Sequence, residues 1–265
     1  MIRTVAPTEA AVLERLELER PELVTTSDLT ALLDEFGIGT LPRVFAARLR
    51  AKGWLLPTDQ CGVWEFAPAA LAGPYSSNNS LLPLRSFLTR HPDTQCGLTF
   101  QAAAWAHGLA ERVPVRPEIA VADAVMVRRL PGSLDASAFA PVLPYAEVSG
   151  VPVLAVESVI VHMCVKPNAV RSWASAAEWL PDLAAEASVG GIKRELAERP
   201  RTVAIRTGYL LQSMRPDIAD RIAEVSPMTG KTRFGSRSHQ LRYDSRWQVI
   251  DTLLPFEPRS LESVA

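Results

Sequence analysis

Apolar side chains recur three or four positions apart in three places within the first fifty residues, and this spacing predicts three α-helices. The first helix is expected over residues 7–18, beginning at Pro7 or Thr8. The second is expected over residues 28–36 and the third over residues 42–52, with Gly37 and Gly53 ending them. Thr40 stands just before the third helix and can cap it.

The pattern changes after Gly53. Apolar and aromatic residues at 54–56 and 63–66 flank a polar turn at 57–62, an arrangement that predicts a β-hairpin. Helix, helix, turn, helix and two-stranded ribbon is the order of a winged helix-turn-helix. The first domain is therefore expected to be a winged helix-turn-helix DNA-binding domain over residues 1–70.

The remaining residues, 71–265, are expected to form a larger α+β domain, connected to the first by the Ala-, Pro- and Gly-rich stretch at 67–74. Extended segments are expected at 116–130, 142–147 and 151–153. Helices are expected at 81–90, 97–108, 158–165, 172–186, 192–197, 202–212 and 216–224. Because the strands mostly precede a run of helices, the pattern favours an α+β domain over alternating β-α-β units.

Charge separates the third predicted helix from its surroundings. Residues 40–53 carry four basic side chains and no acidic one, whereas residues 1–39 carry eight acidic and three basic side chains. The whole chain has 28 basic and 29 acidic residues, so any affinity for nucleic acid must come from such a local patch.

On a helical wheel, the apolar residues of the third helix and its polar residues fall on opposite sides. Leu41, Phe45 and Leu49 form the side expected to pack, and the opposite side carries Thr40, Arg43, Ala47 and Arg50. Arginine can pair bidentately with guanine or with phosphate, and a small residue between two arginines permits close approach to base edges.

The residues expected to contact DNA follow from this wheel and from the hairpin. Arg43 and Arg50 are expected to read the major groove, with Ala47 between them; the remaining contacts, to the DNA backbone, are expected from Thr40, Lys52 and, in the hairpin turn, Gln60. The alternative reading of the same charges is a solvated helix face.

A second basic stretch lies at 229–247, where basic side chains alternate with Phe234, Tyr243 and Trp247. Its candidate phosphate-binding residues are Lys231, Arg233 and Arg237. The alternative is a surface loop followed by a strand whose aromatic side chains pack in the core.

The familiar signatures of enzymes are missing from the sequence. There is no P-loop, no dinucleotide-binding glycine pattern, no HExxH, no GxSxG and no CxxC, so we expect no catalytic residues and no cofactor. Three dispersed cysteines exclude a disulfide framework and a four-cysteine zinc site. His162-Met163-Cys164 is expected to belong to the core rather than to a metal site, and Glu178, Asp182 and Glu186 to a solvated helix face.

The first residues, MIRTVAPTEAA, do not resemble a secretory signal, and the apolar stretch at 148–165 is interrupted by Pro152 and Glu157. We therefore expect a cytoplasmic protein without a membrane span, which free cysteines also fit.

Six segments resemble AbiEi-type antitoxins, the DNA-binding members of abortive-infection toxin–antitoxin pairs. In the first domain these are VTTSDL (24–29), LRAKGWL (49–55) and GVWEFAP (62–68); in the second they are GLTFQAAAWAHGL (97–109), VPVLAVESVIVHMCV (151–165) and RTGYLLQSM (206–214). The hairpin residues Cys61-Gly62-Val63-Trp64 are less basic than the wing typical of that family.

The resemblance implies a transcriptional autoregulator that binds inverted repeats in double-stranded DNA upstream of its own operon. It also implies that the protein counteracts a nucleotidyltransferase-like toxin without forming a stable complex with it. Two other functions stay open: a winged-helix module that binds protein within a complex lacking DNA, and an enzyme with an unfamiliar site in the second domain.

Overall fold

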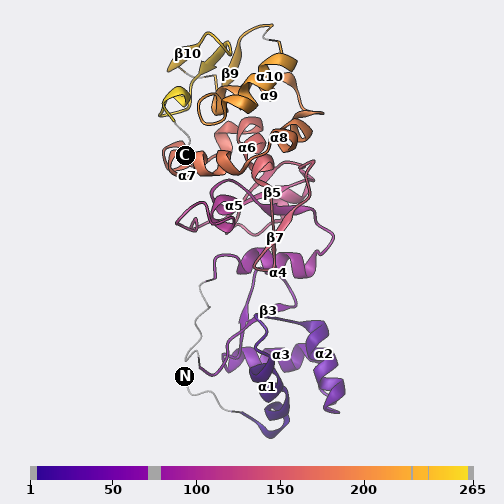
Figure 1. Cartoon of the computed structure of the whole chain (residues 1–265). Coiled ribbons are helices and arrows are strands. Elements are labelled where there is room, and N and C mark those ends of the chain that lie inside the picture. The colour runs from indigo at the N-terminus through magenta and orange to yellow at the C-terminus, as the bar shows by residue number, and fades with distance from the viewer. Residues whose placement is uncertain (1–4, 71–78, 228, 238, 262–265) are drawn as a thin grey trace. The chain divides into compact units, whose positions relative to one another are not determined.

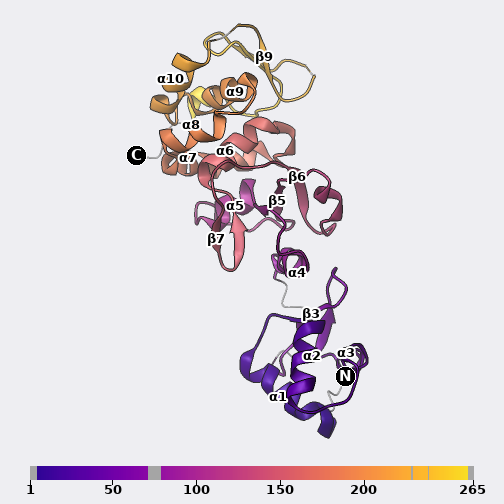
Figure 2. The same ribbon diagram turned by 90° about the vertical axis from the view of Figure 1, so that its right-hand side faces the viewer.

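The structure of the protein is a computed structural model that describes residues 5–70, 79–227, 229–237 and 239–261. The chain forms two compact units, Met1–Thr94 (unit 1) and Gln95–Ala265 (unit 2). Helices and strands occur in both units, as the two views in Figures 1 and 2 show, so the predicted mixed α+β architecture is confirmed.

The described part of unit 1 contains four helices and one small antiparallel sheet. Its elements are α1 (Pro7–Glu19), β1 (Leu23–Thr25), α2 (Thr26–Glu35), α3 (Pro42–Ala51), β2 (Leu55–Pro57), β3 (Val63–Phe66) and α4 (Leu82–Arg90). The strand order is β1-β3-β2. The three predicted helices and the hairpin are confirmed, whereas β1 was not expected.

The ends of α2 and α3 follow from their sequences. α2 begins at a capping box in which the Thr25 hydroxyl accepts a hydrogen bond from the Asp28 N–H (3.1 Å) and the Asp28 carboxylate accepts one from the Thr25 N–H (2.8 Å). Gly53, with φ of 75°, follows α3 in a conformation that favours glycine. The prediction that Thr40 caps α3 is wrong, because Leu41 occupies that position and no side chain caps this end.

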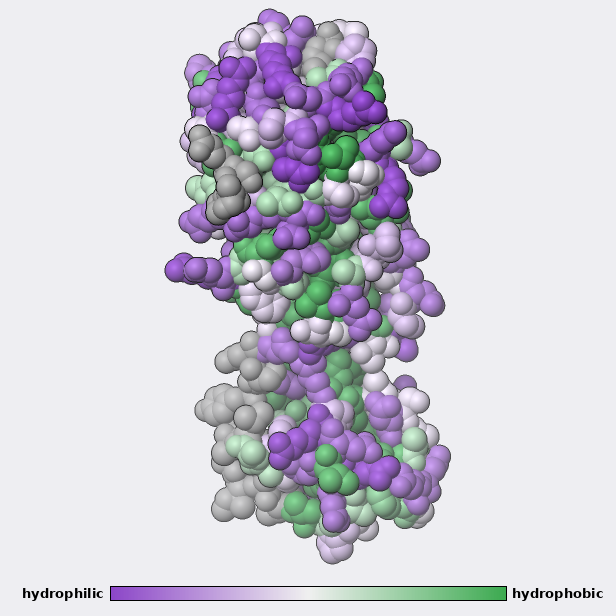
Figure 3. All heavy atoms as spheres, in the orientation of Figure 1, coloured by the Kyte–Doolittle hydropathy of each residue, from purple (hydrophilic) through white to green (hydrophobic). Residues whose placement is uncertain are grey.

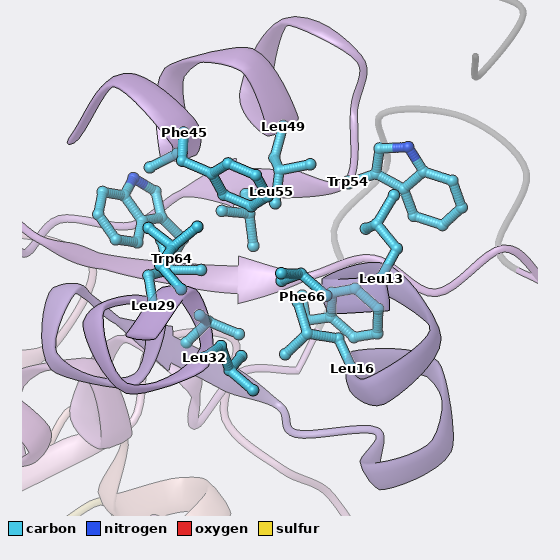
Figure 4. Close-up of a cluster of buried hydrophobic side chains, with 14 residues drawn as sticks. Leu13, Leu16, Leu29, Leu32, Phe45, Leu49, Trp54, Leu55, Trp64 and Phe66 are labelled. Atoms are coloured by element: carbon cyan, nitrogen blue, oxygen red, sulfur yellow. The ribbon is translucent and has the colours of Figure 1, made fainter. Parts of the chain in front are cut away.

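The core of unit 1 lies where α1, α2 and α3 meet the sheet (Figure 4). α1 contributes Leu13 and Leu16, and α3 contributes Phe45 and Leu49, all at most 4% exposed. β3 runs between these helices and brings Trp64 and Phe66 into the same cluster. This packing fixes which side of α3 is buried, and therefore which side faces solvent.

Unit 1 continues past the domain boundary predicted near residue 70, because α4 belongs to it. Glu22, just before β1, pairs with Arg85 of α4 and accepts a hydrogen bond from the Asn79 amide at 2.5 Å. α4 also contacts β3. The predicted connection at 67–74 lies partly outside the described residues.

Unit 2 contains a five-stranded mixed sheet, a group of helices and a three-stranded sheet. Its strands are β4 (Cys96–Leu98), β5 (Glu118–Val121), β6 (Asp135–Ala138), β7 (Ala146–Val148), β8 (Val151–Val153), β9 (Thr232–Phe234), β10 (Arg242–Asp244) and β11 (Val249–Asp251). Its α-helices are α5 (Phe100–Ala106), α6 (Val156–Val165), α7 (Trp173–Glu186), α8 (Val189–Leu196), α9 (Arg201–Leu211) and α10 (Pro216–Val225). The strand orders are β6-β5-β4-β8-β7 and β10-β11-β9.

The predicted helices from α6 to α10 are confirmed, but two other predictions in unit 2 are wrong. Residues 97–108 contain the end of β4 before the short α5, and residues 116–130 contain only one strand followed by a 3-10 turn at Met126–Arg129. Gly97 explains the first difference: a Cβ there would lie 2.9 Å from the Pro152 carbonyl, so glycine permits β4 to approach β8.

The three-stranded sheet is fastened to α9 by the residues of the RTGYLL segment. The Arg206 guanidinium donates to the Arg233 carbonyl at 2.6 Å, and the Tyr209 hydroxyl donates to Asp251 at 3.0 Å. Between them, Gly208 lies directly against the fully buried ring of Trp247. In this structure the segment therefore holds unit 2 together.

Candidate nucleic-acid interface

The exposed side of α3 carries the two arginines predicted to lie there. Phe45, Ala46 and Leu49 face the core and are at most 1% exposed. Arg43 and Arg50 lie on the exposed side with Ala47, as the helical wheel predicts. Leu41 is an exception to the wheel: it is 73% exposed because it precedes the helix, with extended backbone angles.

Neither arginine forms an ion pair in the part of unit 1 that the structure describes. Among the described residues, no carboxylate lies within ion-pair distance of Arg43 or Arg50. The last turn of α3 places Arg48 and Arg50 at the negative end of the helix dipole, which favours cations there. α3 thus offers two exposed guanidinium groups that are free to bind an anion.

Lys52, which is predicted to contact the DNA backbone, forms an ion pair within unit 1. Its ammonium group pairs at 2.5 Å with Glu9 of α1, a side chain only 3% exposed. Burial acts to raise the pKa of Glu9, but the hydrogen bonds from Lys52 and the Ala6 N–H, together with the charges of Lys52 and Arg48, outweigh it and lower that pKa. Lys52 therefore joins α1 to α3, and its expected contact with the DNA backbone stays a prediction.

A groove of about 700 Å³ runs along the arginine side of α3. It is bounded by the start of α2 at 25–27, by the hairpin at 61–64 and by Thr89 and Arg90 of α4, and no acidic residue lines it. Arg90 makes a third arginine beside Arg43 and Arg50. The sequence did not suggest Thr89 and Arg90, because nothing in their own segment shows that α4 belongs to unit 1.

The remaining two predicted contacts flank α3 less directly. Thr40 is half-buried, and its N–H donates to the Ile38 carbonyl at 2.8 Å. Gln60 lies in the hairpin turn, which the Thr58 hydroxyl closes by donating to the Val63 carbonyl at 2.8 Å. Gln60 precedes the groove-lining stretch and does not itself line the groove.

The second basic stretch is divided between internal pairs and exposed side chains. Arg242 pairs with Asp251 at 3.2 Å and Arg246 with Asp220 at 2.5 Å. The three candidate residues are exposed without a carboxylate partner among the described residues: Lys231, Arg233 and Arg237. In the orientation of Figure 3, the surface over this part of unit 2 is mostly hydrophilic.

The aromatic side chains of that stretch divide in the same way. Phe234 and Trp247 are fully buried, whereas Tyr243 is 45% exposed and lies 5.6 Å from the Lys231 ammonium, measured to the ring centroid. The alternative in which the aromatic side chains pack in the core is therefore correct for Phe234 and Trp247 but not for Tyr243. The exposed basic side chains form a cationic surface in the same stretch.

The titratable groups inside unit 2 are parts of its core. His162 is fully buried between the rings of Phe100 and Phe139, and its two ring nitrogens contact the hydroxyls of Thr99 (2.8 Å) and Ser137 (3.1 Å). Burial lowers the pKa of His162, so the ring is neutral near pH 7. This agrees with the expectation of a core histidine.

Glu118 is a second buried group of unit 2. Burial raises its pKa to about 7, although its carboxylate accepts a hydrogen bond from the Ala102 N–H at 3.1 Å. In the described part of the chain, no three His, Cys, Asp or Glu side chains are grouped so that they could hold a metal ion. Within that part, no helix is both long and apolar enough to cross a membrane.

Residues 95–213 match the family model of the AbiEi antitoxin C-terminal domain, and the match begins at the first residue of unit 2. Unit 2 therefore contains a segment that is similar to an antitoxin domain. More specifically, this segment is similar to the AbiEi antitoxin C-terminal domain, and the resemblance to AbiEi-type antitoxins seen in the sequence is confirmed over residues 95–213.

A solved structure resembles the chain over both units. It is the crystal structure of the RV2827C protein from Mycobacterium tuberculosis, with 27% sequence identity and a TM-score of 0.81. The similarity covers 96% of this chain and 94% of that chain. None of the curated proteins compared matches the sequence.

Proposed function

We propose that this protein is a DNA-binding autoregulator of a toxin–antitoxin operon and a cytoplasmic, non-enzymatic antagonist of a nucleotidyltransferase-like toxin. Unit 1 is the DNA-binding part: a winged helix-turn-helix in which α3 enters the major groove and the β2–β3 hairpin is the wing. Unit 2 is the antitoxin part. The operator consists of inverted repeats upstream of the operon.

One observation carries the DNA-binding proposal: α3 presents Arg43 and Arg50 to solvent with no carboxylate beside them in the described part of unit 1. Three further features support it. The order α1-β1-α2-α3-β2-β3 is that of winged helices. Arg90 adds a third cation to the groove, and no acidic residue lines the groove to repel phosphate.

Arg43→Ala and Arg50→Ala are each expected to weaken specific DNA binding by about 1–3 kcal/mol, because each removes a guanidinium group that pairs with a base edge. The measurement is a fluorescence-anisotropy titration of the full chain with a duplex from upstream of its operon. A duplex of equal length and unrelated sequence measures the affinity for non-specific DNA.

Arg15→Ala is the matched control, because it removes one arginine from the exposed side of α1, outside the groove. It is expected to change the affinity little. If Arg43→Ala and Arg50→Ala bind the operator as well as Arg15→Ala does, α3 does not read DNA, and the protein-binding alternative for unit 1 becomes the better one.

The antitoxin part is tested separately by co-expression with the toxin gene of the same operon. Growth is expected to be restored by the full chain and equally by the Arg43→Ala/Arg50→Ala double variant, because the latter changes only unit 1. Loss of rescue with the double variant would contradict this division of roles.

The exposed basic surface of unit 2 is proposed as a second phosphate contact. Lys231→Ala with Arg233→Ala is expected to lower the slope of log K against log salt by about 2, since each lost phosphate contact removes about one. Salt titrations of the anisotropy signal measure this slope. An unchanged slope would remove this surface, and Arg237 with it, from the DNA interface.

A further inference from the structure

A second groove, of about 410 Å³, lies within unit 2 between α8 and α10. Each helix lines it with positions i, i+3, i+4 and i+7: 189, 192, 193 and 196 on α8, and 218, 221, 222 and 225 on α10. Such positions share one face over two helical turns, about 10 Å of helix length. The groove is therefore two helical turns long.

The floor of the groove is aliphatic, and so are two of its edges. Ile192, Ile218 and Ile222 form the floor and are at most 5% exposed. Val189 at the start of α8 and Val225 at the end of α10 are 37% and 67% exposed. Large aliphatic side chains at the edge of an apolar groove gain free energy when another apolar surface covers them.

The charged side chains that line the groove all have the same sign. Four basic side chains line the groove and no acidic one does. Arg199 and Arg221 have carboxylate partners at 2.9 and 2.6 Å, but Lys193 and Arg201 have none among the described residues. The buried Nε of Arg201 also lacks an acceptor there. The groove thus combines an apolar floor with a net positive edge.

We propose that this groove binds a short acidic amphipathic helix of a partner protein. Aliphatic side chains on one face of that helix lie on the isoleucine floor, and flanking carboxylates pair with Lys193 and Arg201. Duplex DNA is a poorer occupant, because phosphates and base edges gain nothing from an apolar floor. The docking site is separate from unit 1 and goes beyond the proposed function.

The test uses the full chain and two labelled synthetic peptides of about fourteen residues with leucines at helical a and d positions. One peptide carries glutamates at its other positions and the second carries lysines. The glutamate peptide is expected to bind at least about tenfold more tightly by fluorescence anisotropy. Val225→Glu and Lys193→Glu, tested separately, are each expected to weaken its binding by about tenfold.

Val115→Glu is the matched control, since Val115 is 91% exposed in unit 2 and lies outside the groove. It is expected to leave peptide binding unchanged. Arg43→Ala, which tests the DNA-binding proposal, is also expected to leave peptide binding unchanged, so the two proposals can fail independently. Both groove positions are exposed, and unaltered thermal unfolding of the variants shows that they still fold.

Three results would overturn the proposal. The first is equal affinity for the two peptides, and the second is equal binding by Val225→Glu and Val115→Glu. The third is a peptide-free chain that sedimentation shows to be dimeric and that Val225→Glu makes monomeric, because the occupant would then be a second copy of the chain.

Discussion

Glu195→Ala is expected to destabilise unit 2 by about 3–5 kcal/mol, because it removes the acceptor on which four donors converge. Glu195 of α8 is 0% exposed. Its Oε1 accepts hydrogen bonds from the Val142 N–H (2.8 Å), the Leu143 N–H (2.9 Å) and the Ser158 hydroxyl (2.6 Å), and its Oε2 accepts one from Arg199 (2.9 Å). Alanine would leave the buried Leu143 N–H and Ser158 hydroxyl without this acceptor, whereas Arg199 would keep its hydrogen bonds to the Ala140 and Glu195 carbonyls.

Calorimetry of the full chain measures this loss, with the transition of unit 1 as an internal reference. For Glu195→Ala, the unfolding temperature of a unit of this size is expected to fall by about 10 °C.

Glu195→Gln is expected to lose less stability, because its amide oxygen can still accept the three hydrogen bonds made to Oε1, while its NH₂ group faces Arg199. Glu198→Ala, on the exposed side of the same segment, should stay within about 0.5 kcal/mol. If Glu195→Ala and Glu198→Ala lower the unfolding temperature equally, the hydrogen bonds to Glu195 contribute little to the stability of unit 2.

Gly208→Ala is expected to destabilise unit 2 by about 3 kcal/mol, although alanine favours a helix over glycine by about 1 kcal/mol. The added Cβ would lie 2.1 Å from the Cη2 atom of Trp247, far inside the contact distance of about 3.5–4.0 Å. Trp247 is fully buried, so it cannot turn aside into solvent. The steric overlap therefore outweighs the gain in helix propensity.

Urea unfolding followed by circular dichroism tests this prediction. Gly190→Ala is the control, because Gly190 is also helical and nothing lies within 4 Å of its added Cβ. It should be neutral or slightly stabilising. Adding Trp247→Phe removes the ring atoms that the new Cβ would meet, so the double variant should lose less stability than the two single losses added together. Strict additivity would contradict the proposed overlap.

The predictions from sequence succeeded where the signal was local. The helices of unit 1 and its hairpin depend on spacing, capping and turn residues, all within a few positions of one another. The sequence does not predict β1, because a three-residue strand is identified only by its pairing with β3, some forty positions away. Likewise, the apolar pattern over residues 97–108 predicts one helix, because the short α5 follows β4 after a single residue.

In the candidate site, too, only the local features can be predicted from the sequence. A helical wheel is enough to place Arg43 and Arg50 on the exposed side of α3. No spacing rule could show that Lys52 pairs with Glu9, 43 positions earlier, or that Arg90 completes the groove. Both results depend on tertiary contacts: α1 packs near the end of α3, and Glu22 holds α4 in unit 1 through Arg85.

The attachment of the three-stranded sheet to α9 determines how much of unit 2 must be kept together with the segment that matches the antitoxin family. The family match ends at residue 213, yet the rings that cover the inner face of α9 come from Phe234 and Trp247, beyond that point. A polypeptide shortened to the matched segment would uncover Tyr209 and its neighbours to water. Such a fragment would be prone to aggregation, and the smallest autonomous version of unit 2 must retain the sheet.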